Sequence, residues 1–160
     1  MATKKNVRVQ GSRFWAYEPE TQTLIRLSCL TTFDPGSDSA GKIEDTCLDE
    51  EDLKTYVPGL SDAGEGSLGF NFDLNNTSHA QILTWAGSKV PLTIVMGEPK
   101  NDVDIPTVDA GALKLPTNRT FWKMDATLTN PVWKFEKDTL VNCTVTMQRK
   151  TTVQVVRATT

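Results

Sequence analysis

Apolar and polar residues alternate with a period of two along several stretches of the chain, which is the pattern of a strand with one buried and one solvated face. The alternation is clearest over residues 25–29, 122–128 and 141–147. Weaker candidates, several of them bounded by Gly, Pro or Asp turn signals, are residues 7–10, 14–18, 67–72, 92–96, 132–135 and 152–156. The pattern therefore predicts a mainly β protein.

One stretch follows a helical period instead and predicts a short helix over residues 77–86. Asn76 or Ser78 can cap its start, and Gly87 can end it. The apolar residues that share one face at this spacing are Ile82, Leu83 and Ala86. A single short helix beside many strands predicts a β-sandwich or partly open barrel with the helix on its flank.

Residues 34–66 differ from the rest of the chain, because they have little periodicity and are rich in polar, acidic and turn-forming types. They predict a long acidic loop. Loops of this length are uncommon inside a compact domain, and they are usually functional or remain disordered until they meet a partner. We therefore expect this loop to take part in an interaction.

Length and composition predict one soluble domain over residues 1–160. Hydrophobic types make up 38% of the residues and charged types 23%, and no apolar run approaches the roughly 20 residues of a membrane helix. No apolar stretch follows the basic start, so we expect no secretory signal and assembly inside a cell. Three widely spaced cysteines and one histidine argue against a disulfide framework and against a structural zinc site.

The formal net charge of -3 is unevenly distributed along the chain. Residues 1–33 hold five basic and two acidic residues, residues 34–73 hold two basic and eleven acidic residues, and residues 74–160 hold ten basic and seven acidic residues. An acidic middle segment thus lies between two mildly basic arms. Such an asymmetry usually concerns partners or assembly and says little about the fold.

Candidate catalytic and ligand-binding residues are few. His79 is the one available base for a Ser-His-Asp arrangement, and its place at the helix start favours a packing or polar contact. Carboxylates are abundant over residues 44–52, but such a charge run is typical of a solvated or partner-facing surface. Asp102, Asp104 and Asp109 are candidates for a weakly held cation. Without a phosphate-binding glycine motif, the sequence predicts no enzyme, no cofactor and no metal centre.

Residues 44–98 resemble the major tail tube proteins of long-tailed bacteriophages, the siphophages. An acidic loop leads to TYVPGL and then to a Gly-Ser start of an alternating strand at Ser67; a short helix opening at His79 and a strand ending in Gly-Glu follow. The segment DTLVNCTVT, residues 138–146, is similar to the final strand of the family. The resemblance depends on the order and spacing of these parts.

The resemblance implies a structural virion protein whose copies form hexameric rings that stack into the tail tube, the conduit for DNA ejection. It also implies assembly in the bacterial host cytoplasm, a final place in the virion tail, and contacts with the tape measure, tail terminator and tail tip proteins. Double-stranded DNA is expected only in transit, because the slightly acidic chain lacks a basic patch with interleaved aromatic residues. No membrane contact is expected.

Given this resemblance, the acidic loop is the expected stacking element between rings. Its acidic residues are Asp45, Asp49, Glu50, Glu51 and Asp52. The expected basic counterpart on a neighbouring ring consists of Lys4, Lys5, Arg8 and Lys150. The polar face of one strand is expected to line the lumen, with Lys123, Asp125 and Thr127. Strand edges are expected to pair with the next subunit, so that the ring closes without a free edge.

Other interpretations remain open from the sequence. A tube protein of a contractile injection or secretion system would share the fold and the ring. A β-sandwich carbohydrate-binding module would use Trp15, Trp85, Trp122 and Trp133 as stacking platforms, although Trp122 lies on an apolar strand face and Trp85 on the helix, which favours core packing. A small hydrolase based on acidic residues is the third alternative.

Overall fold

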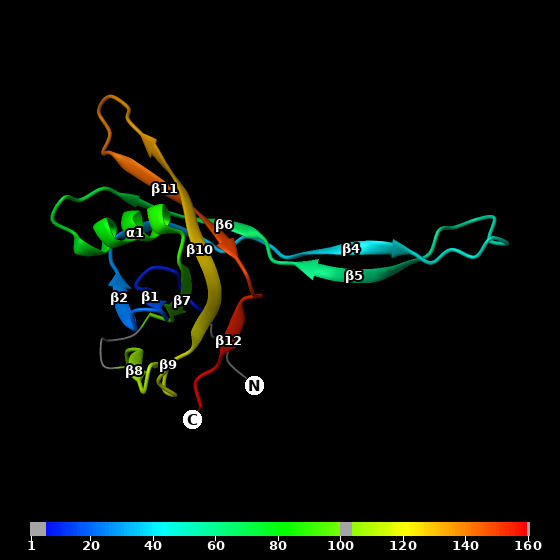
Figure 1. Cartoon of the computed structure of the whole chain (residues 1–160), viewed down its shortest axis with the longest axis horizontal. Coiled ribbons are helices and arrows are strands. Elements are labelled where there is room, and N and C mark those ends of the chain that lie inside the picture. The colour runs from blue at the N-terminus through cyan, green and yellow to red at the C-terminus, as the bar shows by residue number, and fades with distance from the viewer. Residues whose placement is uncertain (1–5, 100–103, 160) are drawn as a thin grey trace.

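The computed structural model describes residues 6–99 and 104–159 (Figure 1). Over these residues the chain is mainly β, as predicted, with a single helix, α1 (Thr77–Ser88). The strands are β1 (Arg13–Glu18), β2 (Thr23–Leu27), β3 (Leu30–Asp34), β4 (Ser39–Glu44), β5 (Tyr56–Asp62), β6 (Glu65–Asn71), β7 (Pro91–Gly97), β8 (Thr107–Asp109), β9 (Ala112–Lys114), β10 (Phe121–Lys134), β11 (Asn142–Arg149) and β12 (Gln154–Val156).

One antiparallel sheet forms most of the body, in the order β2-β1-β7-β10-β11-β6-β3, with β12 paired to the start of β10. Its first and last strands, β2 and β3, are consecutive in the chain and are separated by Ser28 and Cys29 alone. Cys29 has a φ of 57°, which lets the chain turn sharply between them. Because so short a link joins the two ends of the sheet, the sheet must curl into a partly open barrel.

The main core lies on the inner face of this curved sheet and under α1, and a smaller cluster of Trp15, Val95 and Phe121 is buried on the opposite face. The alternation predicted over residues 122–128 and 141–147 is confirmed. Met124, Ala126 and Leu128 point inward from β10 and alternate with more exposed polar residues. Cys143, Val145 and Met147 do the same from β11. The helix adds its apolar face to the same cluster through Ile82, Trp85 and Ala86.

The helix begins where the sequence predicts and ends slightly later. Asn76 is the N-cap, and its side-chain oxygen accepts a hydrogen bond from the Ser78 N–H at 3.0 Å. The prediction that Gly87 ends the helix is wrong, because Gly87 lies inside the last turn. The chain leaves the helix at Lys89, which has a φ of 55° and donates its N–H to the Trp85 carbonyl at 2.8 Å.

One expectation about a strand is corrected by the structure, and one strand pair is additional. Residues 7–10 form no strand; they lead into a turn over residues 9–12, in which the Ser12 N–H is bonded to the Val9 carbonyl at 3.0 Å. Four alternating residues are too few to specify a strand when no neighbouring strand pairs with them. The short hairpin of β8 and β9 was not predicted, since three-residue strands leave almost no periodic signal.

The acidic segment contains a second, two-stranded sheet, β4 with β5, where the sequence predicts a loop. We call residues 39–62 the arm and residues 45–55 its tip. The arm reaches away from the body (Figure 1). Every residue of its strands is exposed except Gly59, so neither face is buried. Without a buried face there is no alternation, which explains why the strands are absent from the sequence pattern.

Candidate assembly surfaces

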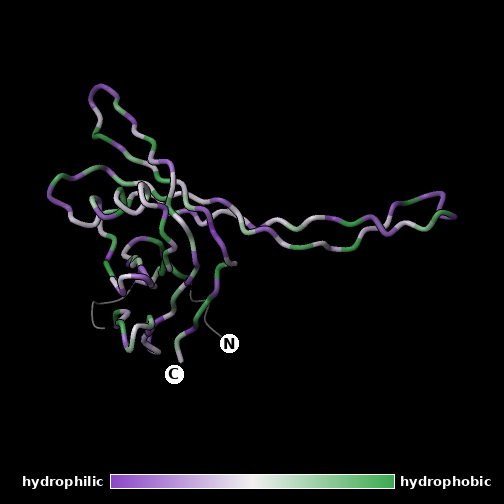
Figure 2. Tube along the Cα trace, viewed as in Figure 1, coloured by the Kyte–Doolittle hydropathy of each residue, from purple (hydrophilic) through white to green (hydrophobic). Residues whose placement is uncertain are grey.

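The arm exposes apolar side chains on both of its faces. Ile43 pairs with Val57 on one face, and Tyr56 occupies the opposite face beside Glu44. Leu48 and Leu60 are exposed to 107% and 94%. Figure 2 shows hydrophobic and hydrophilic residues interspersed along the whole arm. An isolated two-stranded hairpin is marginally stable in water, and contiguous exposed apolar patches are a feature of protein interaction sites.

The acidic residues predicted for stacking meet at the end of the arm. The five residues are exposed on or beside one irregular turn, and they are Asp45, Asp49, Glu50, Glu51 and Asp52. The turn is closed at its base by Thr55, whose carbonyl accepts from the Asp45 N–H at 2.8 Å and whose hydroxyl donates to the Asp45 carbonyl. The arm therefore presents a concentrated negative charge beside the exposed Leu48.

The predicted basic counterpart is only partly described. Lys4 and Lys5 lie outside the described residues. Arg8 is exposed on the segment before β1, and Lys150 is exposed directly after β11, where its N–H bonds to the Asp125 carbonyl at 2.8 Å. Both belong to the body, whereas the acidic residues lie at the tip of the arm.

The residues predicted for the lumen share the outer face of β10, opposite the core. Lys123, Asp125 and Thr127 are partly exposed there. The Asp125 carboxylate accepts a hydrogen bond from the Thr93 hydroxyl at 2.9 Å. The pairing register continues this surface across β11 and β6, because Thr129 lies opposite Thr146 and Thr146 lies opposite Ser67.

Sequence reasoning named only the β10 part of this outer surface. The further positions that pairing adds are mainly hydroxyl and amide side chains: Ser67 and Asn71 from β6, and Asn142, Thr144, Thr146 and Gln148 from β11. We call them, with Lys123, Asp125, Thr127 and Thr129, the polar sheet face. The polar half of the alternation in β11 already contained this signal, but only the pairing shows that the three strands lie side by side.

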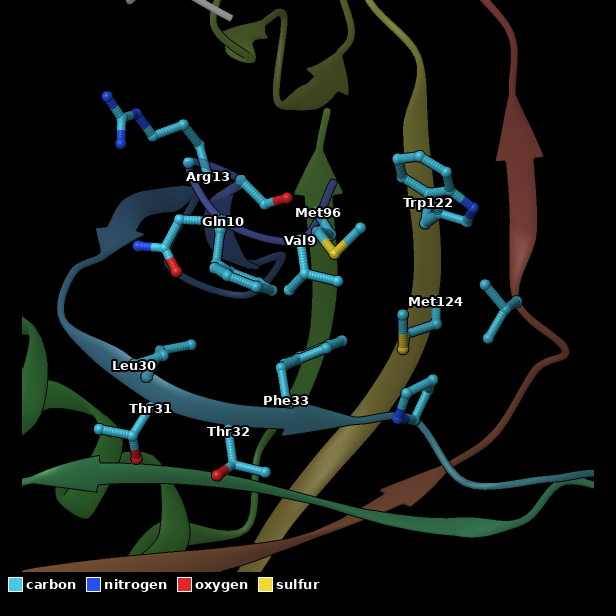
Figure 3. Close-up of a pocket in the computed structure, with 15 residues that line it drawn as sticks. Val9, Gln10, Arg13, Leu30, Thr31, Thr32, Phe33, Met96, Trp122 and Met124 are labelled. Carbon is cyan, nitrogen blue, oxygen red and sulfur yellow. The ribbon is translucent and has the colours of Figure 1, made fainter. Parts of the chain in front are cut away.

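An apolar cavity of about 440 Å³ opens on the inner side of the sheet (Figure 3). Phe33 from β3, Met96 from β7, and Trp122 and Met124 from β10 line it. Phe14 closes one side by packing its ring 4.9 Å from that of Phe33. The cavity lies between the inner surfaces of the partly open barrel, so Trp122 faces the interior of the fold.

The other tryptophans also have packing roles. Trp15 and Trp85 are buried. Trp133 is exposed, and its ring packs edge-on against Phe72 at 5.3 Å and stacks with Phe135 at 6.3 Å. The four rings therefore do not form the exposed row that a carbohydrate-binding platform needs.

His79 is fully buried, and both of its ring nitrogens are engaged. Nδ1 accepts a hydrogen bond from the Asp73 N–H at 3.2 Å, and Nε2 faces the Ser28 carbonyl at 3.1 Å. Nε2 also lies 3.3 Å from Nδ2 of the helix-capping Asn76. The ring also stacks on Phe70 at 4.4 Å. His79 therefore has the packing role that its position predicts, joining the helix start to the turn after β2.

Of the three candidate cation ligands, Asp102 lies outside the described residues. Among the residues that the structure describes, no three His, Cys, Asp or Glu side chains gather as a metal site would require. Asp109 instead forms a surface ion pair with Lys114 at 3.8 Å. The described part of the chain also contains no helix that is both long enough and apolar enough to cross a membrane.

A family model described as phage tail tube, TTP, lambda-like matches residues 5–159. Structural protein 3 of Pseudomonas phage PAJU2 is 26% identical over 120 residues, which cover 66% of this chain and 73% of that protein.

Two solved structures are similar in fold. A chain of the anti-feeding prophage baseplate, a 6-fold symmetrised cryo-EM structure, aligns with a TM-score of 0.67 and 8% identity, covering 99% of this chain and 100% of its own. The SPP1 tail tube, a hybrid structure from solid-state NMR and cryo-EM, aligns with a TM-score of 0.63 and 10% identity, covering 94% and 78%. At such low identities these two likenesses concern the fold alone.

Proposed function

We propose, from the premise that this chain belongs to the lambda-like phage tail tube family, that its copies close into hexameric rings which stack into the conduit for DNA ejection. Family membership makes it a structural protein of the virion tail and favours the tail tube over a carbohydrate-binding module or a hydrolase. The proposal adds the hexameric ring, the stacking of rings and the role in DNA ejection. It also assigns the whole chain, residues 1–160, to one tail tube domain. The exposed arm is the observation on which it rests.

The arm has the reach and the surface of an element that docks on another copy. Its paired strands of six and seven residues extend about 20 Å beyond the body. They carry apolar side chains on both faces that the chain itself leaves in water. Burial of such groups in a neighbour provides a favourable free energy of association.

We assign this docking to contacts between successive rings. A head-to-tail contact uses two different surfaces of the same chain, so it propagates along an axis instead of closing a pair. The acidic tip residues would meet basic residues of the next ring, with Arg8 and Lys150 as the described candidates and Lys4 and Lys5 as the others. Charge complementarity of this kind mainly steers the encounter and sets its register.

Ring closure would use the edges of the sheet. β2 and β3 each have one unpaired edge, and β12 is a short edge strand with exposed Val155 and Val156. Exposed edges that are not blocked by charge pair readily with other chains. Sixfold closure is supported by the symmetry stated for the structurally similar anti-feeding prophage baseplate.

The polar sheet face is our candidate for the lumen wall. Its side chains are mainly hydroxyls and amides, with Lys123 and Asp125 of opposite charge among them, so this face presents little net positive charge to phosphate groups. A wall that does not neutralise phosphates does not retain DNA in transit. The remaining partners would be the tape measure, tail terminator and tail tip proteins, met during assembly in the host cytoplasm.

The test is to reverse the charge at the tip by changing Asp49, Glu50, Glu51 and Asp52 to Lys. We expect a folded subunit, shown by an unchanged circular dichroism spectrum, that forms no tubes in negative-stain electron microscopy. Unchanged tubes would refute the stacking role of the tip.

A matched pair of double variants separates position from net charge. Glu50→Lys with Glu51→Lys changes the tip, whereas Glu20→Lys with Glu136→Lys makes the same charge change at exposed sites on the body. We expect only the tip variant, Glu50→Lys with Glu51→Lys, to reduce tube formation. Equal losses would assign the effect to net charge instead of the arm.

A further inference from the structure

The root of the arm, residues 34–38 and 63–66, is packed too tightly for any side chain at its glycines. A Cβ at Gly36 would lie 2.0 Å from the Glu65 carbonyl oxygen, and a Cβ at Gly64 would lie 2.0 Å from that of Ser37. Backbone atoms cannot yield as a flexible side chain does, so the two strands cross in direct backbone contact. The arm leaves the body through this crossing.

Arg149, the last residue of β11, contacts the root of the arm from the body. Its Nε donates to the Pro35 carbonyl at 2.6 Å, and its Nη2 forms an ion pair with the Asp38 carboxylate. Its Nη1 donates to the Thr151 carbonyl at 3.1 Å, which ties the guanidinium to its own strand end. One side chain thus holds residues on both sides of Gly36, immediately before β4 begins.

The burial of this arginine needs an explanation beyond packing. Its side chain is only 1% exposed, against 34% for that of Asp38. Burying a charged guanidinium costs free energy that its partners must offset, and an apolar side chain of similar size often stabilises a fold equally well. An arginine in such a place specifies geometry, because its rigid fork sets the directions of several acceptors at once.

We propose that Arg149 is a positioning residue that sets the direction in which the arm leaves the body. The arm would then be presented to the next copy at a fixed angle before contact. A preset arm loses less conformational freedom on docking than a freely pivoting one, so association is stronger. The inference rests on the proposed function only in assuming that the arm docks; the direction of the arm can be measured on the isolated subunit.

The chain provides its own labelling sites for this measurement. Cys47 is exposed at the tip and Cys29 is exposed on the body, whereas Cys143 is buried. Nitroxide labels on Cys29 and Cys47 report the distance between tip and body by double electron-electron resonance, below the concentration at which tubes form. The native chain should give a narrow distance distribution.

Arg149→Lys retains the positive charge but cannot bond Pro35, Asp38 and Thr151 in one plane. We expect a clearly broader distance distribution and an increase of about tenfold in the protein concentration needed for tube formation. Arg157→Lys, at an exposed position near the C-terminus, is the matched control and should change neither value. A distribution as narrow as the native one in Arg149→Lys, or a broad one in the native chain, would overturn the inference.

A second variant changes the more exposed partner of the Arg149–Asp38 ion pair, in case Arg149→Lys does not fold. Asp38→Asn removes the ion pair and is expected to broaden the distribution to a smaller degree. If Arg149→Lys broadens the distribution but forms tubes at native concentrations, the positioning role is refuted while the proposed function stands. If the native chain forms no tubes under any condition, the proposed function fails, whereas the distance data still decide what Arg149 does.

Discussion

The body and the arm are both antiparallel β structure, yet they follow opposite physical rules. In the body, each long strand has one face in a shared core of apolar residues such as Leu68, Phe70 and Val145. In the arm, both faces are in water and apolar side chains such as Leu60 are almost fully exposed. The body is stabilised by what it buries, whereas the arm acquires a buried face only when another molecule covers it.

The sharpest way to test this contrast is to remove the same side chain from both regions. Leu68→Ala empties a fully buried site on β6, and we expect it to lower the free energy of unfolding by about 2–5 kcal/mol. Leu60→Ala removes an almost fully exposed side chain from β5, with an expected change within about 0.5 kcal/mol. Urea unfolding followed by circular dichroism measures both. Equal losses would mean that the arm is packed against the body in solution.

The crossing at the root should be the next most sensitive place, because it links the two regions. Gly64→Ala would put a Cβ 2.0 Å from the Ser37 carbonyl oxygen, so we expect a loss of about 1–3 kcal/mol and few or no tubes. Gly41→Ala is the control within the arm, since its Cβ would meet nothing within 4 Å. Chemical unfolding and electron microscopy of both variants provide the comparison. A neutral Gly64→Ala would show that the crossing is loose.

The apolar groups of the tip should matter for assembly and not for folding. Leu48→Ser with Leu53→Ser leaves the body untouched, and we expect an unchanged melting temperature. Loss of about 1.4 kcal/mol of docking free energy would raise the concentration needed for tube formation about tenfold. Sedimentation of tubes at increasing protein concentration measures this value. An unchanged concentration would mean that the two leucines remain exposed in the tube.

The smallest effect concerns the cysteines, which report the contrast without disturbing it. Burial raises the pKa of the Cys143 thiol, so a smaller fraction of it is thiolate at any given pH below that pKa. We expect iodoacetamide at about pH 8 to modify Cys29 and Cys47 quickly and Cys143 slowly. Peptide mass spectrometry over time measures the three rates. Equal rates would indicate that the core around β11 opens often.

Much of the body could be predicted from the sequence because its local pattern and its burial agree. The alternation around Met124 and Val145 appears in β10 and β11, and the cap at Asn76 appears at the start of α1. His79 at the helix start has the packing role that its position suggests. These features depend on a few neighbouring residues, which a sequence pattern can represent.

The arm and the site residues were less predictable. The acidic segment was expected as a loop, since strands exposed on both faces have no alternation. The polar sheet face was named only through β10, because the register that adds Thr146 and Ser67 joins residues far apart in the chain. The roles predicted for the acidic tip, for Arg8 and Lys150 and for Asp125 remain predictions, which the variants above address.

By itself, the sequence determined the mainly β class, the position of the helix, the inward residues of the central strands and the concentration of negative charge in residues 34–66. Only the tertiary structure decided that this charge lies at the end of a projecting hairpin. It also decided that Arg149 bonds to Pro35 at the root of the arm, more than a hundred residues earlier in the chain. Local patterns report which face of an element is buried. They contain no information on which distant backbone atoms meet, and the direction of the arm depends on those contacts.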